Sequence, residues 1–220
     1  MFYATDTNDH GLKFNPFKAL IVPRPVGWVS TLSEDGIPNL APFSFFNAVG
    51  DNPPMIMFSV GWRNNTLQNI EATKECTISF ASKPLIDAMN MSSAGVDESV
   101  NEFALAGIKG AASQRVKPER VAASPAAMEC RYWKSIEMPA KHDGSPGYTM
   151  VLAEVIGVYI NDECIKDGLV DTASMQPIAR LGYMDYAVVD ESNMFSLNRP
   201  VASEDGLSAT LDSGPWNGKY

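Results

Sequence analysis

Short runs of apolar residues, separated by turn residues, divide the first part of the chain. Val26 to Leu32 is rich in β-branched and aromatic residues, which favours a strand. Ser33 to Gly36 then supplies turn residues, and a second apolar segment runs from Ile37 towards Phe46. Asp51 to Pro54 ends that segment. The pattern therefore predicts a β-hairpin at the start of the fold.

The next segments alternate between strand and helix. The continuous apolar run Met55 to Val60 is typical of a strand that is covered on both faces. Asn64 or Asn65 can cap a helix that continues through Thr73. A strand from Cys76 to Phe80 follows, so the local order is strand, helix, strand.

The second half begins with a helical pattern and returns to strands. Residues 82–107 predict two helices, or one helix interrupted at Ser92, Ser93 and Gly95. Further strands are predicted at Ala127 to Ile136, Tyr148 to Ile160, Asp185 to Val189 and Phe195 to Leu197. The tail from Ser203 is rich in glycine, and we expect it to be loosely ordered or docked on a partner.

These elements together favour a mainly β (α+β) fold. Six or so strands with helices inserted between them indicate a closed or nearly closed barrel, because a doubly wound parallel sheet would need regular βαβ alternation. The sequence contains neither GxGxxG after its first strand nor GxxxxGK[ST]. We expect a single domain over residues 1–220, with a core of about 15–200 and a C-terminal tail of 201–220.

Composition narrows the classes of partner. The net charge of −9 disfavours nucleic acid and anionic membrane surfaces, because both need a basic face on the protein. The longest apolar stretch, Tyr148 to Ile160, contains Glu154 and is too short to span a bilayer. Three cysteines lie far apart, which predicts unpaired thiols, and two histidines give no metal-site spacing. We therefore expect a cytoplasmic protein without a metal site.

Several motifs occur in a fixed order along the chain. They are PRPVGWVST at 23–31, NLAPFSFFNAVGDNPPMIMFSV at 39–60, RNNT at 63–66, VKPERVAASPAAMECR at 116–131 and ARLGYMDYA at 179–187. This set resembles the flavin reductase family with the FMN-binding split barrel, and its flavoredoxin-like branch in particular. The resemblance covers about Asn15 to Pro200. It implies a split β-barrel of six antiparallel strands in a Greek key with inserted helices, acting as a homodimer with FMN at the subunit interface.

FMN carries a dianionic phosphate, and RNNT has residues that suit it. Arg63 offers a fixed fork of donors, while Thr66 and the N–H groups at the start of the helix from Asn65 add a hydroxyl and a helix dipole. The alternative interpretation is a solvated turn with a capping asparagine. Arg24, between two prolines, is either a second cation for the phosphate or a surface charge.

The flavin ring needs small polar groups and a flat apolar surface. Candidates for its pyrimidine edge are short polar side chains and backbone groups: Ser30, Thr31, Ser44 and Asn47, with the backbone of Ala41, Pro42 and Phe43. Ser30 and Thr31 point to opposite faces of a strand, so we expect a side-chain contact from Thr31 and a backbone contact from Ser30. Pro42 removes a ladder donor and frees its neighbours to face a ligand.

The same residues have structural interpretations as well. Each Ser or Thr can be an ordinary strand or turn residue, and Phe43, Phe45 and Phe46 can be barrel core. Trp28 and Trp62 can line the pocket or pack in the core.

No catalytic acid–base pair or nucleophile stands out, and hydride transfer to a flavin does not require one. His142 is either a nicotinamide or acceptor contact or an exposed loop residue. Ala179, Tyr183, Tyr186 and the tail are candidates to reach across a dimer.

The leading functional hypothesis is an FMN-dependent, NAD(P)H-oxidising flavin reductase. It would pass a hydride to FMN N5 and electrons onward to flavin, oxygen, a metal ion or a monooxygenase. The alternative is a flavoredoxin-type electron carrier that is reduced by a redox protein. A third possibility is a split barrel that holds a deazaflavin or haem.

Overall fold

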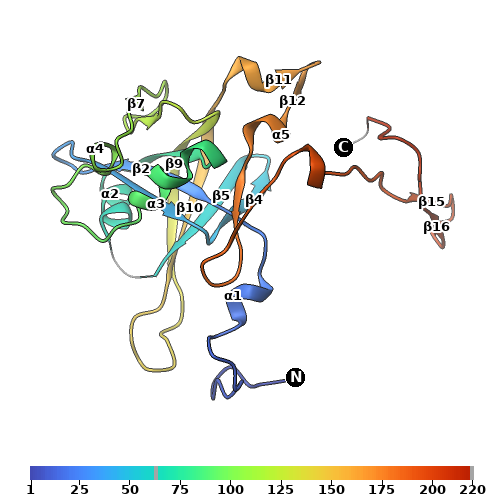
Figure 1. The fold of residues 1–220 in the computed structure, drawn as a ribbon, viewed down its shortest axis with the longest axis horizontal. Coiled ribbons are helices and arrows are strands. Elements are labelled where there is room, and N and C mark those ends of the chain that lie inside the picture. Colours follow the sequence, from blue (N-terminus) through green and yellow to red (C-terminus); the bar gives the residue numbers. More distant parts are fainter. Residues whose placement is uncertain (62–63, 219–220) are drawn as a thin grey trace. The chain divides into compact units, whose positions relative to one another are not determined.

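The computed structural model describes residues 1–61 and 64–218. The chain divides into two compact units, Met1–Val189 and Asp190–Tyr220, which are described separately. Figure 1 shows the elements of both units coloured along the sequence.

A seven-stranded antiparallel sheet forms the first unit, with strand order β3-β2-β6-β9-β10-β5-β4. Its strands are β2 (Gly27–Leu32), β3 (Pro38–Phe43), β4 (Phe46–Asp51), β5 (Pro54–Val60), β6 (Glu75–Phe80), β9 (Ala126–Glu137) and β10 (Thr149–Ile160). Six predicted strands correspond to these seven, because the segment from Ile37 towards Phe46 is broken into β3 and β4.

The two edge strands of this sheet are consecutive in sequence. Only Ser44 and Phe45 separate the end of β3 from the start of β4, so Phe43 and Phe46 can be at most about 11 Å apart between Cα atoms. The ring of Phe46 also lies so close to Gly27 on β2 that a Cβ there would be 2.8 Å from it. The sheet must therefore curl into a barrel, and β3 and β4 are not hydrogen-bonded neighbours in its strand order. This is the split barrel that the motif resemblance implies.

Hydrophobic residues from β2, β5, β6, β9, β10 and helix α2 fill the barrel. They include Val29, Phe58, Ile70, Ile78 and Val151, all fully buried. The expectation that Met55 to Val60 is covered on both faces is wrong: Ile56, Phe58 and Val60 are buried, and the residues between them are half-buried. That alternation places one face of β5 in the barrel.

Helix α2 (Asn65–Thr73) is the longest described helix and agrees with the prediction. The other helices are short: α1 (Phe17–Leu20), η1 (Lys83–Leu85), α3 (Ile86–Met91), α4 (Glu102–Leu105), η2 (Asp162–Cys164) and α5 (Thr172–Met175). A second core of Trp28, Leu40, Met89 and Phe103 packs α3 and α4 against the outer face of β2 and β3. Trp28 is therefore a core residue. None of the described helices is long and apolar enough to cross a membrane.

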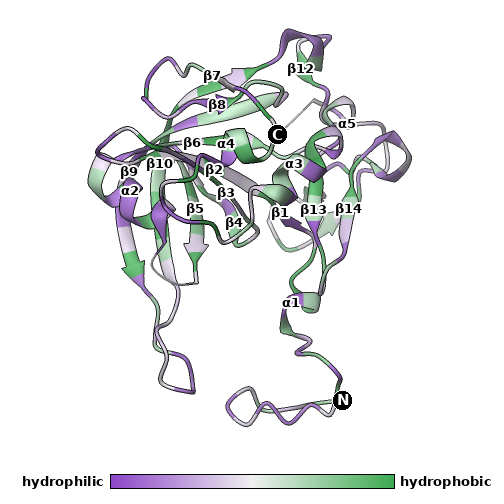
Figure 2. Cartoon of the chain, turned by 60° about the vertical axis from the view of Figure 1, so that its left-hand side comes forward, coloured by the Kyte–Doolittle hydropathy of each residue, from purple (hydrophilic) through white to green (hydrophobic). Residues whose placement is uncertain are grey.

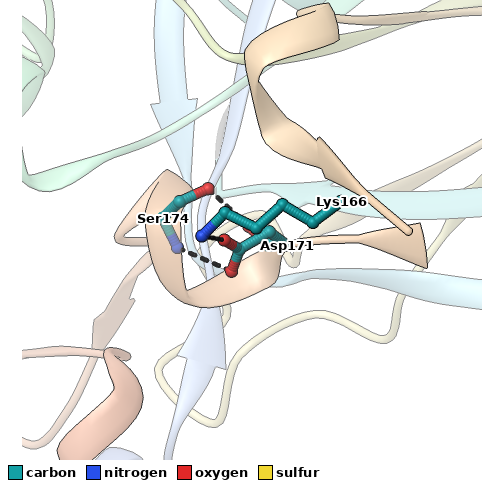
Figure 3. Close-up of polar contacts among 3 residues, drawn as sticks. All are labelled: Lys166, Asp171 and Ser174. Carbon is teal, nitrogen blue, oxygen red and sulfur yellow. Dashed lines mark hydrogen bonds and ion pairs between the residues drawn. The ribbon is translucent and has the colours of Figure 1, made fainter. Parts of the chain in front are cut away.

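Short strands complete the first unit: β1 (Arg24–Pro25), β7 (Gly110–Ala111), β8 (Arg120–Val121), β11 (Ile165–Lys166), β12 (Leu169–Val170), β13 (Ile178–Arg180) and β14 (Tyr186–Val188). Lys166 forms an ion pair with Asp171, whose Oδ1 also accepts from the Ser174 N–H at 3.1 Å and so caps α5 (Figure 3). The loop that joins β9 to β10 projects beyond the sheet, at lower left in Figure 2.

The second unit consists of η3 (Glu191–Asn193) and a small hairpin of β15 (Val201–Ala202) and β16 (Ala209–Thr210). Residues 195–197 do not form the predicted strand, and the side chains of Phe195 and Leu197 are exposed. A strand without a pairing partner or a buried face has nothing to stabilise it, which accounts for this error.

Candidate functional site

A cleft of about 460 Å³ lies beside β3, on its edge away from β2. Its walls are formed by Asn39, Ala41, Pro42 and Phe43 of β3, Val60 and Gly61 at the end of β5, Asn64 to Thr66 at the start of α2, the loop Ser92 to Val96 after α3, Glu102 of α4, and Tyr148 before β10. The cleft therefore joins the two segments that the sequence proposes for ring and phosphate.

The start of α2 presents the phosphate-binding candidates. Asn64 is the N-cap, and its Oδ1 accepts from the Leu67 N–H at 3.1 Å. The remaining N–H groups of the first turn have no partner within the helix, and the helix dipole gives this end a partial positive charge. Asn65 and Thr66 line the cleft at this point. The geometry suits an anion.

Side-chain hydrogen bonds hold this helix end against the sheet. The Asn39 amide on β3 donates to Thr66 Oγ1 at 2.9 Å and to Thr31 Oγ1 at 3.4 Å. The Asn69 amide on α2 donates to Thr31 Oγ1 at 3.2 Å. Thr66 Oγ1 accepts a hydrogen bond from Asn39, so the hydroxyl hydrogen of Thr66 can still be donated to another acceptor.

The β3 wall is apolar in its side chains from Ala41 to Phe43, while Asn39 adds a polar one. The Phe43 ring packs on Phe58, with centroids 5.1 Å apart, and this contact fixes its orientation. Tyr148 also lines the cleft, and its ring meets that of Phe45 edge-on with centroids 5.5 Å apart. A flat ring can lie against such a surface.

The free edge of β3 offers acceptors rather than donors. The Leu40 N–H donates to Glu102 Oε2 at 3.0 Å, so it points away from β2. Backbone groups alternate along a strand, so those of Pro38 and Pro42 point the same way, and proline has no N–H. Along this edge Pro38 and Pro42 leave carbonyl oxygens without a neighbouring N–H donor, and of these two residues Pro42 lines the cleft.

Glu102 is a buried carboxyl group in the cleft wall. It is the first residue of α4, which Asn101 caps by accepting from the N–H groups of Phe103 and Ala104. Only 5% of Glu102 is exposed. Burial raises the pKa of its carboxyl, against the opposing effect of the N–H groups that it accepts from, including that of Leu40.

Five of the eleven predicted ligand contacts line the cleft: Ala41, Pro42, Phe43, Asn65 and Thr66. Arg63 lies outside the described residues, as does Trp62. The remaining five, Arg24, Ser30, Thr31, Ser44 and Asn47, do not line it.

Ser30 and Thr31 are both buried, and Thr31 Oγ1 serves the network described above. Ser44 is half-buried in the link between β3 and β4. Asn47 is exposed on β4, where its Oδ1 accepts from the Ala48 N–H.

Arg24 is not a surface charge. It is 6% exposed, and its terminal nitrogens donate to the backbone oxygens of Lys18 and Ile21 at 2.6 Å and of Leu181 at 2.9 Å. Burial lowers its pKa, and the neighbouring Arg180 lowers it further. These contacts give Arg24 a structural role, tying the segment before β1 to the turn after β13.

Sequence reasoning missed the walls that come from later in the chain. Ser92 to Val96, Glu102 and Tyr148 carry no local signal, because α3 and α4 are brought to β3 by the second core. The loop histidine His142 is exposed and does not line the cleft.

Another cavity, of about 340 Å³, lies on a different part of the sheet and is almost entirely apolar. Ser79 and Thr172 are the polar side chains in its lining, and none of the predicted ligand contacts that the structure describes lines it. The cleft beside β3 is therefore the better candidate site.

The fold and this cleft define the class: a split-barrel protein of the flavin reductase type. The chain matches the flavin reductase like domain family over residues 19–179, and it belongs to that family. An uncharacterised protein of Aquifex aeolicus is 36% identical over 169 residues, which are 74% of this chain and 83% of that protein.

Two solved structures extend the comparison. Nitrilotriacetate monooxygenase component B from Bacillus cereus has a TM-score of 0.79 at 26% identity, covering 90% of this chain and 98% of that chain. Flavoredoxin of Desulfovibrio vulgaris (Miyazaki F) shares the fold, with a TM-score of 0.68 at 23% identity, over 77% of this chain and 88% of that chain.

Proposed function

We propose that this protein binds FMN in the cleft beside β3 and acts as an NAD(P)H-dependent flavin reductase. The observation that carries the proposal is the cleft itself, which unites Ala41 to Phe43 with the start of α2. Its volume of about 460 Å³ falls in the range of about 300–1,000 Å³ that is usual for small-ligand sites.

The residues present suit the three surfaces of FMN. The start of α2, with Thr66 and the adjacent Arg63, would hold the phosphate. The backbone carbonyl of Pro42, on the free edge of β3, suits the N–H group of the pyrimidine ring. Phe43 and Tyr148 would cover part of the ring system and exclude water from it.

FMN, when bound, supplies the redox chemistry by accepting a hydride at N5 from NAD(P)H and passing electrons onward. The protein's task is then to bind, orient and shield. No base is required of the chain, which agrees with a cleft whose titratable lining residues are Glu102 and Tyr148 among those described. Flavin, oxygen or a monooxygenase would receive the electrons.

We also propose a cytoplasmic homodimer. Apolar side chains are exposed around α1, where Leu20 is 73% exposed, and on β9, where Trp133 is 64% exposed. Exposed apolar residues of this size are typical of surfaces that meet another chain. The free thiols of Cys76, Cys130 and Cys164 are compatible with a reducing compartment.

Steady-state oxidation of NADH and of NADPH, with and without added FMN, tests the enzymatic proposal. We expect turnover with at least one nucleotide that depends on FMN. A flavin spectrum without turnover, together with reduction by a protein donor, would instead identify a flavoredoxin-type electron carrier. A haem or deazaflavin spectrum of the purified protein would contradict both.

A further inference from the structure

Glu102 is the one carboxyl group among the described residues that line the cleft. It is buried in the wall, and its Oε2 accepts a single hydrogen bond from β3, at Leu40. The ion pairs found among the described residues join Arg131 to Glu154 and Lys166 to Asp171, so no described cation balances Glu102. An ionised carboxylate in this position is therefore compensated by N–H groups alone, those of Leu40 and of Glu102 itself.

The groups around Glu102 do not neutralise it. Strand β3, on which α4 packs, carries no titratable residue, and Tyr148 faces the same cleft. Asp97 and Glu98, on the loop between α3 and α4, are exposed acids, and so is Asp87 on α3. The described surroundings are thus neutral or acidic.

An anion held at the start of α2 would share the cleft with this carboxyl. The proposed phosphate site at the start of α2 and Glu102 line one cleft of about 460 Å³. Two like charges in a partly desolvated site cannot both be kept without a large electrostatic cost, so one group takes up a proton. Burial already raises the pKa of the Glu102 carboxyl, and a bound anion would shift it the same way.

We propose that Glu102 is the proton-coupled residue of the cleft: binding of an anionic ligand is accompanied by protonation of the Glu102 carboxyl. This inference rests on the proposed FMN function. The protonation state of Glu102 would then determine how tightly the cleft binds an anionic ligand. Ligand affinity then falls as the pH rises through the pKa of Glu102, because the proton must be taken from an increasingly basic solution.

The test is the FMN dissociation constant of wild type and Glu102→Gln between about pH 5 and pH 8, where raised carboxyl pKa values commonly fall. Glutamine keeps an oxygen that can accept from the Leu40 N–H but carries no charge. FMN's own phosphate titrates in both proteins, so its effect cancels in the ratio of the two constants. Glu98→Gln is the matched control, because it removes an equal charge from an exposed, solvent-screened position.

We expect the ratio of wild-type to Glu102→Gln dissociation constants to rise with pH, by about tenfold for each pKa unit of coupling. The ratio for Glu98→Gln should stay within about twofold of one, as for a screened surface charge. Calorimetry of wild type at about pH 7, in buffers of different ionisation enthalpy, should show net proton uptake. Most of the FMN phosphate is already dianionic there, because its second pKa is about 6.

Parallel pH profiles for wild type and Glu102→Gln would overturn the inference and leave FMN binding intact. If Glu102→Gln does not fold, the absence of proton uptake by wild type overturns it equally. Failure of wild type to bind FMN at any pH would overturn the proposed function, and this inference with it.

Discussion

Asn39, Thr31 and Thr66 form the polar contact that fixes the start of α2 beside β3. The Asn39 amide donates to both threonine hydroxyls, and Asn69 donates to Thr31 from the helix. All the donors are buried or half-buried, so losing an acceptor would leave an unsatisfied amide. The proposed anion-binding end of α2 is therefore held in place by neutral side chains, and the charge for a phosphate must come from elsewhere.

Arg63 is our proposed source of that charge. Replacing it in Arg63→Ala should weaken FMN binding by about tenfold to a hundredfold, as expected for loss of a charge-assisted hydrogen bond of about 1.5–3 kcal/mol. Riboflavin, which has no phosphate, should lose little. Fluorescence titration of both ligands measures the difference.

Arg131→Ala is the control, because Arg131 pairs with Glu154 on the exposed surface and does not line the cleft. Equal losses for FMN and riboflavin in Arg63→Ala would show that Arg63 does not bind the phosphate.

At this scale the sequence predicts local roles better than distant ones. The cap at Asn64 follows from a helix start that is visible within a few residues. The role of Thr31 depends on Asn69, 38 residues further along, and strand alternation could not show that its hydroxyl meets an amide of α2. Arg24 is buried for a similar reason: one of its carbonyl partners, Leu181, is 157 residues away.

At the scale of elements, the approach of β4 to β2 closes the barrel. A Cβ on Gly27 would lie 2.8 Å from the Phe46 ring, closer than carbon atoms in folded proteins come. The absence of a side chain at Gly27 lets this ring pack across the strand, next to the split between β3 and β4.

Gly27→Ala should therefore destabilise the protein by about 1–3 kcal/mol, as usual for overpacking. The Gly27→Ala/Phe46→Leu double variant should show a smaller loss than the sum of the two single losses, because the smaller side chain makes room. Urea unfolding monitored by circular dichroism measures all three. Additive losses would mean that the contact with Phe46 does not limit the space at Gly27.

Strands and helices with a buried face are predicted well, and the interruptions between them less so. Helix α2 and strands β6, β9 and β10 lie within a residue or two of their expected bounds. The sequence does not predict the break at Ser44. Residues 40–49, LAPFSFFNAV, are mostly apolar, and Pro42 is the one turn-favouring proline or glycine among them. The chain turns there because it must cross from one edge strand of the curled sheet, β3, to the other, β4. This requirement comes from closure of the whole barrel.

At the scale of the whole molecule, the site depends on the free edge of β3. Barrel closure leaves this strand with one hydrogen-bonded neighbour, β2. Another strand could not pair easily with its free edge, because Pro38 and Pro42 have no N–H and the Leu40 N–H already donates to Glu102. Alternating apolar residues predict a barrel, and the motif resemblance supplies its split topology. Neither predicts the α3–α4 wall, because that wall depends on a second core assembled from distant segments.

The central claim is that FMN occupies the cleft between β3 and α2, and a crystal structure of the protein grown with FMN tests it most directly. We predict electron density for the phosphate at Asn65 and Thr66, and for the ring against Ala41 to Phe43 and Tyr148. FMN bound in the apolar cavity that includes Ser79, or a cleft without flavin density at saturating FMN, would contradict the account.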